Sequence, residues 1–223
     1  MTKGARKTRR IRGVRGKCFP RRVSRAFPIK TTILIIGEGQ ETEPNYFDGL
    51  KREDKVVAKF TVTVKRGHGF SPEKVVKEAI EHKARAERRA ETYDEVWCVI
   101  DAEGPEKRES LGQAAALAKE NSIRLCLSNP SFEVWFLAHF EKTGKAFNDG
   151  DAVIVRLNKH WRKHHTQDYQ KSDDRIYRRL CGRTQTAIAN AQWVREDHFR
   201  HVADTADCNS STEVYRLVGY LIG

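Results

Sequence analysis

The chain has 223 residues, of which 39% are hydrophobic and 32% are charged, and its formal net charge is +12. This length suits one compact core with extensions, and no stretch approaches the roughly 20 apolar residues that a membrane span requires. The basic N-terminus is not followed by an apolar segment like that of a secretion signal, so we expect a protein that neither crosses a membrane nor is secreted.

The five cysteines are widely separated along the chain and form no CxxC pair. Such spacing argues against a structural zinc site and against a disulfide framework. Cys98 and Cys126 lie inside apolar runs, where a thiol usually packs as a small core hydrophobe. The cysteine pattern therefore predicts a cytoplasmic protein in a reducing compartment.

The whole charge excess lies at the N-terminus. Residues 1–30 contain 12 Lys or Arg and no acidic residue, which leaves 42 − 12 = 30 basic residues against 30 acidic ones in the rest. A segment of this composition cannot bury enough apolar surface to order itself, so we predict a flexible basic arm. Its expected partners are the phosphates of nucleic acid or an acidic protein surface, and a merely solubilising arm stays open as an alternative.

After the arm, strand patterns and helix patterns alternate. Four short apolar runs, rich in β-branched and aromatic residues or alternating apolar with polar ones, predict strands at residues 31–36, 60–65, 95–100 and 123–127. Helical periodicity and helix-start signals predict helices at about residues 43–53, 71–90, 111–120 and 131–140. Thr42 is the expected N-cap of the first of these helices. Four such units in a row predict an α/β fold with a parallel sheet covered by helices on both faces.

The last third of the chain reads differently. Residues 141–223 contain no clear strand pattern. Their helical candidates are residues 151–163, 174–180, 184–199 and 211–221. We therefore expect three parts: a flexible basic arm (1–30), an α/β core (31–140) and a helical C-terminal extension packed on that core (141–223).

Three acidic residues follow predicted strands. Glu38 comes one residue after the first strand, and Asp101 and Glu103 stand at the end of the third. Ligands of a parallel sheet gather at the carboxyl ends of its strands, and crowded carboxylates are costly unless a cation offsets their charge. One such acid is most simply an ordinary strand-end residue, but the three together favour a site for Mg²⁺, with Mn²⁺ as an alternative.

Other polar residues are weaker candidates for the same site. Glu133 begins the helix after the fourth strand, where an acid is either a catalytic group or a favourable charge at a helix N-terminus. Ser128 and Asn129 precede that helix and either orient a substrate or cap the helix. Lys65 or Arg66, after the second strand, is a candidate for neutralising a bound phosphate.

Two aromatic patterns remain open. Four aromatic residues recur at helical spacing and favour core packing over base stacking: Phe132, Trp135, Phe136 and Phe140. Residues 159–165 mix Lys, Arg, His and Trp. This segment suits RNA binding, metal chelation through His160 and His164, or a solvated helix end.

Four segments together resemble the RloB family. They are residues 36–47 (IGEGQETEPNYF), 96–101 (VWCVID), 128–140 (SNPSFEVWFLAHF) and 210–218 (SSTEVYRLV). The resemblance covers roughly residues 31–220. It implies a Toprim-like fold, in which a small parallel sheet carries a Glu after its first strand and an Asp-x-Asp after a later one, and binds Mg²⁺.

The resemblance also assigns residues. Glu38 matches the motif glutamate and Asp101 the first aspartate, whereas Glu103 stands where the second aspartate is expected and is longer by one methylene. Family members are often encoded beside an ATPase of the AAA or ABC type in phage-defence and abortive-infection loci. The function so implied is a metal-dependent nuclease that hydrolyses DNA or RNA as an anti-phage effector. The alternative is a non-catalytic subunit that binds nucleic acid or the ATPase on a Toprim-like scaffold.

Overall fold

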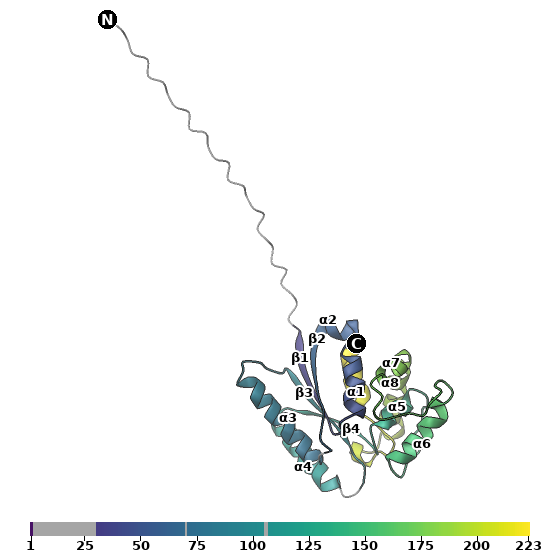
Figure 1. Cartoon of the computed structure of the whole chain (residues 1–223). Coiled ribbons are helices and arrows are strands. Elements are labelled where there is room, and N and C mark those ends of the chain that lie inside the picture. The colour runs from purple at the N-terminus through teal and green to yellow at the C-terminus, as the bar shows by residue number, and fades with distance from the viewer. Residues whose placement is uncertain (2–29, 70, 105–106) are drawn as a thin grey trace.

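The computed structural model describes Met1 and residues 30–69, 71–104 and 107–223. The predicted basic arm therefore lies outside the described residues, apart from its two ends. Within the described residues, four strands form one sheet in the order β2-β1-β3-β4, and every neighbouring pair is parallel (Figure 1). The predicted α/β architecture with a parallel sheet is confirmed.

Each strand lies within one residue of its predicted bounds. The strands are β1 (Thr31–Gly37), β2 (Phe60–Lys65), β3 (Glu95–Asp101) and β4 (Arg124–Ser128). In β1, four consecutive side chains from Ile33 to Ile36 are completely buried. Such a run, with no polar alternation, is what a central parallel strand needs when helices cover both faces.

The helices of the first 140 residues agree with prediction except in detail. They are α1 (Thr42–Leu50), α2 (Asp54–Lys59), α3 (Pro72–Glu87), α4 (Arg108–Glu120) and α5 (Glu133–Ala138). The N-cap prediction for Thr42 is wrong, because Thr42 is already helical and Glu41 precedes it without a side-chain cap. The short helix α2 was not predicted, since it buries a single residue and so shows little periodicity.

The last third of the chain is helical. It contains α6 (Gly150–Trp161), α7 (Ile176–Leu180), α8 (Thr184–Trp193) and α9 (Val214–Ile222), with short 3₁₀ or π segments at Cys181–Arg183, Val194–His198 and Thr205–Asp207. Residues 141–223 form no strand, although Thr212 makes an isolated antiparallel bridge with Ser128 of β4. No helix in the described part of the chain is long and apolar enough to cross a membrane.

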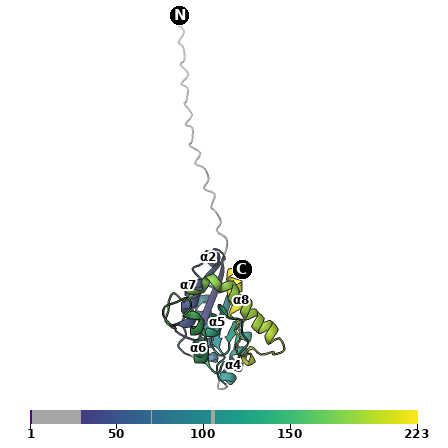
Figure 2. The same ribbon diagram turned by 90° about the vertical axis from the view of Figure 1, so that its right-hand side faces the viewer.

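The helices lie in two layers around the sheet (Figure 1). Helices α3 and α4 cover one face, against alternate residues such as Leu34 and Ile36 of β1. On the other face, Ile33 and Ile35 pack in one cluster with side chains from α1 and from α5 to α9. The C-terminal helices therefore complete the core of the sheet, and Figure 2 shows α5, α6, α7 and α8 together on that side.

This packing makes a prediction about stability. Leu217 of α9 is completely buried in the cluster that covers the sheet. We expect Leu217→Ala to lower the free energy of unfolding by about 2–5 kcal/mol, because the truncation removes buried surface and leaves a cavity. Urea unfolding measures the loss. Val155→Ala, at a side chain that is 62% exposed, is the control and should change stability by less than about 0.5 kcal/mol.

Candidate active site

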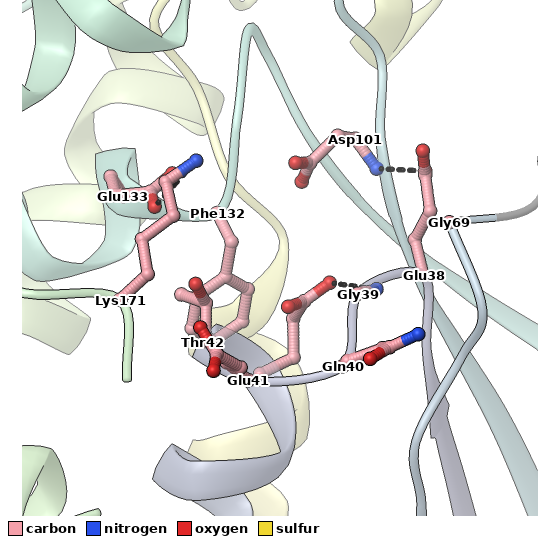
Figure 3. A pocket seen from close by; sticks show the side chains of 11 residues that line it. Glu38, Gly39, Gln40, Glu41, Thr42, Gly69, Asp101, Phe132, Glu133 and Lys171 are labelled. Atoms are coloured by element: carbon pink, nitrogen blue, oxygen red, sulfur yellow. Dashed lines mark hydrogen bonds and ion pairs between the residues drawn. The ribbon is translucent and has the colours of Figure 1, made fainter. Parts of the chain in front are cut away.

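A cavity of about 330 Å³ opens at the carboxyl ends of β1 and β3 (Figure 3). Its walls come from the loop after β1, the start of α1, the end of β3, the start of α5 and the segment between α6 and α7. The side chains that bring charge to it are Glu38, Glu41, Glu43, Asp101, Glu133 and Lys171. The cavity is therefore strongly acidic.

Asp101 is the last residue of β3, and its side chain points into the cavity (Figure 3). The residue as a whole is half-buried, but its Oδ1 atom is closed off from solvent and has no hydrogen-bond partner among the described residues. Burial raises the pKa of this carboxyl well above its usual range, and the carboxylates of Glu43, Glu133 and Glu38 raise it further. The opposing effect of Lys107 is smaller. Asp101 is thus an acid held in an environment that disfavours its charged form.

Glu38 directly follows β1 and lies between the two central strands. Its backbone N–H donates to the carbonyl of Val99 at 3.0 Å, which extends the pairing of β1 with β3. Its carboxylate accepts from the backbone N–H of Asp101 at 3.1 Å and from Lys107 Nζ at 2.7 Å. The structure thus brings Glu38 beside Asp101, as the strand-end argument predicts.

Glu43 is a site residue that the sequence reasoning did not select. It lies in the first turn of α1, is 4% exposed, and accepts a hydrogen bond from the Gly39 N–H at 3.0 Å. Burial raises the pKa of its carboxyl, and repulsion from Glu133 and Glu38 adds to the shift. A Cβ atom on Gly39 would lie 2.9 Å from Glu43 Oε2, so glycine leaves room for this carboxylate. From sequence, Glu43 reads as a routine acid at a helix start.

Glu133, a weaker candidate from sequence, is the first residue of α5, is buried and lines the cavity. Ser131 Oγ donates to its carboxylate at 2.7 Å and the Tyr169 hydroxyl at 3.2 Å. Lys171 Nζ lies 3.7 Å from the same carboxylate. Tyr169 and Lys171 were missed because no local signal links a segment near residue 170 to the ends of the strands.

Glu103 does not line the cavity. Its carboxylate accepts from the Gly150 N–H at the start of α6, at 3.2 Å. Beyond Asp101 the chain stays bonded to β4, through the Ala102 N–H and the Ser128 carbonyl at 2.8 Å, and it carries Glu103 toward α6. The expected ligand set of Glu38, Asp101 and Glu103 is therefore not gathered, and no group of three His, Cys, Asp or Glu within the described ranges is placed to hold a metal ion.

Lys65 and Arg66 also lie outside the cavity lining. Arg66 donates to the carbonyl of Gln40 and, at 3.2 Å, to Asn45 Oδ1, so it braces the loop that forms one cavity wall. Lys65 ends β2, and its charge adds to burial in lowering the pKa of His82 on α3, on the other face of the sheet. The contacts of Lys65 and Arg66 therefore do not support a direct role for either side chain in binding a phosphate in the cavity.

Ser128 and Asn129 are buried and hold the C-terminal segment against β4. The hydroxyl of Ser128 bonds that of Thr212 at 2.7 Å, and Asn129 Nδ2 donates to the Ala206 carbonyl at 2.6 Å. Neither side chain caps α5, whose N-cap residue is Phe132, and neither lines the cavity. Their contacts are structural, since they hold residues 206–212 against the end of β4.

The donor atoms of the cavity suit a hard divalent cation. Asp101 Oδ1 is a buried oxygen with no partner among the described residues, and the carboxylates of Glu38, Glu43 and Glu133 line the same cavity. Mg²⁺ and Mn²⁺ prefer oxygen ligands, and Mg²⁺ is commonly held by one or two carboxylates together with several waters. Asp101 with Glu38 or Glu43 therefore fits such an ion without a third protein ligand.

The fold and the cavity define a class of α/β proteins with a carboxylate-lined site at the ends of parallel strands. Comparison with known families identifies the group within this class. A family model described as RloB-like protein matches residues 33–221, and the chain belongs to this family. No curated protein and no solved structure matches the chain significantly.

The raised pKa of Asp101 predicts how stability depends on pH. The folded protein holds the proton of this carboxyl more tightly than the unfolded chain does, so without a bound cation its contribution to stability falls as pH rises above the unfolded pKa, about 3.9. Asp101→Asn should therefore raise the melting temperature at pH 7–8, by roughly 2–4 °C for each kcal/mol of unfavourable charge removed. The gain should shrink as the pH approaches 4.

Thermal unfolding between pH 4 and pH 8 in the presence of EDTA measures this effect. Glu91→Gln, at an exposed acid outside the cavity, is the matched control and should shift the melting temperature by less than one degree or so. An equal gain at every pH would show that Asp101 is charged throughout, against the account.

Proposed function

We propose that this protein is a metal-dependent nuclease-like enzyme that hydrolyses phosphodiester bonds of DNA or RNA with Mg²⁺, or Mn²⁺, at the acidic cavity. The observation that carries the proposal is Asp101, whose partnerless and buried Oδ1 atom shares a cavity with three glutamates. Repulsion of this kind is relieved by protonation or by a cationic ligand, and shifted acids gathered in a cavity are typical of a functional site. A divalent cation next to a phosphate is such a ligand.

The carboxylates and the bound cation have complementary parts in this proposal. When bound, the cation supplies positive charge beside the scissile phosphate and favours deprotonation of water. Asp101, with Glu38 or Glu43, would hold it. In the hydrolysis, a water oxygen bonds to phosphorus, the bond from phosphorus to the leaving oxygen breaks, and that oxygen takes up a proton.

Other residues of the cavity position these groups. Ser131 and Tyr169 hold Glu133 by two hydrogen bonds, so its carboxylate is oriented to accept the proton of the attacking water. Lys171 is 55% exposed at the cavity wall, 3.7 Å from Glu133, where its charge is available to a phosphate oxygen. Lys107, bonded to Glu38, offsets part of the negative charge that would otherwise repel the substrate.

The biological setting is proposed on the family resemblance alone. We propose a cytoplasmic effector of a prokaryotic anti-phage system of the abortive-infection kind, working with an ATPase partner of the AAA or ABC type. Membership of the RloB-like family supports this setting, since such loci are where the family is expected. The Toprim-like relation of the fold belongs to the same proposal and is supported by the parallel sheet and by the acids at its strand ends.

One observation favours a different function. Glu103 lies outside the cavity, and the three expected metal ligands are not gathered. A non-catalytic subunit that binds nucleic acid or an ATPase would tolerate such an arrangement, because it needs the scaffold and its surface but no metal centre. The two functions differ in whether Asp101 is needed for cleavage or only affects stability.

The direct test is a cleavage assay on labelled tRNA, single-stranded RNA and DNA with Mg²⁺ or Mn²⁺. We expect cleavage that stops in EDTA and falls by roughly 100-fold or more in Glu38→Gln and in Asp101→Asn, since a bound cation contributes several kcal/mol to the transition state. The substrate that is cut identifies the nucleic acid.

Glu91→Gln should retain full activity, because this exposed acid is not part of the cavity. Asp101→Asn must melt at or above the wild-type temperature at the assay pH for the loss to be assigned to chemistry and not to unfolding. Equal cleavage by Asp101→Asn and wild type, or none by wild type with the neighbouring ATPase added, would favour the binding subunit.

A further inference from the structure

Positive charge is concentrated in one stretch of the folded chain. Residues 156–183 contain nine Lys or Arg and three acidic residues, a net charge of +6. The rest of residues 31–223 then has 30 − 9 = 21 basic and 30 − 3 = 27 acidic residues, a net charge of −6. The net charge of residues 31–223 is therefore zero because a positive stretch and a negative remainder cancel.

We call this stretch the basic face: the end of α6, the loop 162–175, and α7 with the turn that follows it, up to Arg183. Five of its nine cations form ion pairs with carboxylates: Arg156, Arg162, Lys171, Arg175 and Arg179. By contrast, Lys159, Lys163 and Arg178 are exposed, and no acid that the structure describes forms an ion pair with them. These three side chains have charge available for another molecule.

Contacts of Arg183 connect the turn after α7 with the loop after α6 and with Phe140. Arg183 lies 3.2 Å from His164 Nε2 and stacks over the ring of Phe140, 5.3 Å from its centre. His160, which the sequence offers together with His164 as a metal-chelating pair, bonds Glu141 at 2.8 Å through Nε2. Figure 2 shows α6 and α7 on the same side of the molecule.

The basic face reaches the acidic cavity. Its loop supplies Lys171 to the cavity wall and Tyr169 to Glu133. The Tyr169 N–H in turn donates to Asn158 Oδ1 on α6 at 2.9 Å, which fixes the loop to the helix. On its outer side the loop also borders a second cavity of about 330 Å³, lined by polar groups that include Gln167 and Arg175.

We infer that the basic face binds the sugar–phosphate backbone of the nucleic acid strand whose phosphodiester bond enters the acidic cavity. The inference rests on the proposed function, because it gives that site its substrate class and binding path. A cavity lined by carboxylates repels a polyanion, so affinity must come from cations beside it. Exposed Lys and Arg side chains supply this affinity, because they release counterions from the phosphates when they bind them.

The test is the affinity of full-length protein for fluorescent 20-nucleotide single strands of RNA and DNA, measured by anisotropy in EDTA so that nothing is cut. The variant Lys159→Gln, Lys163→Gln, Arg178→Gln should bind at least about tenfold more weakly near 0.1 M salt. The slope of log affinity against log salt should fall by roughly two, since each lost single-strand phosphate contact contributes about 0.7.

The matched control is Lys55→Gln, Arg88→Gln, Arg89→Gln, which removes the same three charges from exposed sites outside the basic face. Both variants keep the N-terminal arm, and both should keep the wild-type melting temperature. Control binding within about twofold of wild type supports the inference. Equal losses in the two variants, no loss in either, or no binding by wild type overturns it.

Adding Mg²⁺ or Mn²⁺ to the same samples separates this inference from the nuclease proposal. A selective loss of binding without cleavage by any sample would support the basic face while the nuclease proposal fails. Cleavage that needs Asp101, with binding unchanged in the basic-face variant, would retain the nuclease and overturn the inference.

Discussion

Repulsion among buried carboxylates is the interaction on which the site depends. Asp101 lies with Glu38, Glu43 and Glu133 around one cavity, and burial favours its protonated form, an effect to which repulsion from the three glutamates adds. The fold imposes this arrangement, since β1 and β3 are parallel neighbours and end at the same edge of the sheet. Lys107 and Lys171 offset part of the charge, and a divalent cation would offset more.

Local patterns were sufficient to predict the sheet. Each strand is a short apolar run that ends at a polar residue or glycine, so its bounds could be read within one residue. The order of the strands in the sheet could not be read from these local patterns. The position of residues 141–223 could not be predicted either, because an amphipathic helix shows that it packs on the core but not on which face of the sheet. Leu157, Leu180 and Leu217 all pack on the same side of the sheet as Ile33.

The site was predicted in part. Position after a strand identified Glu38 and Asp101, and position at a helix start identified Glu133. The same reasoning selected Glu103, Ser128 and Asn129, whose contacts with α6 and with residues 206–212 depend on pairings distant in sequence. Glu43 and Tyr169 were missed for related reasons: the first resembles any acid in a first helical turn, and the second lies far along the chain.

The most direct test of this account is to locate Mn²⁺ by anomalous diffraction in crystals of the wild-type protein. The account predicts a peak in the cavity, about 2.0–2.2 Å from a carboxylate oxygen of Asp101 and from one of Glu38 or Glu43, with the remaining positions held by water. No peak in the cavity at saturating Mn²⁺, or a site built on Glu103 without Asp101, would contradict it.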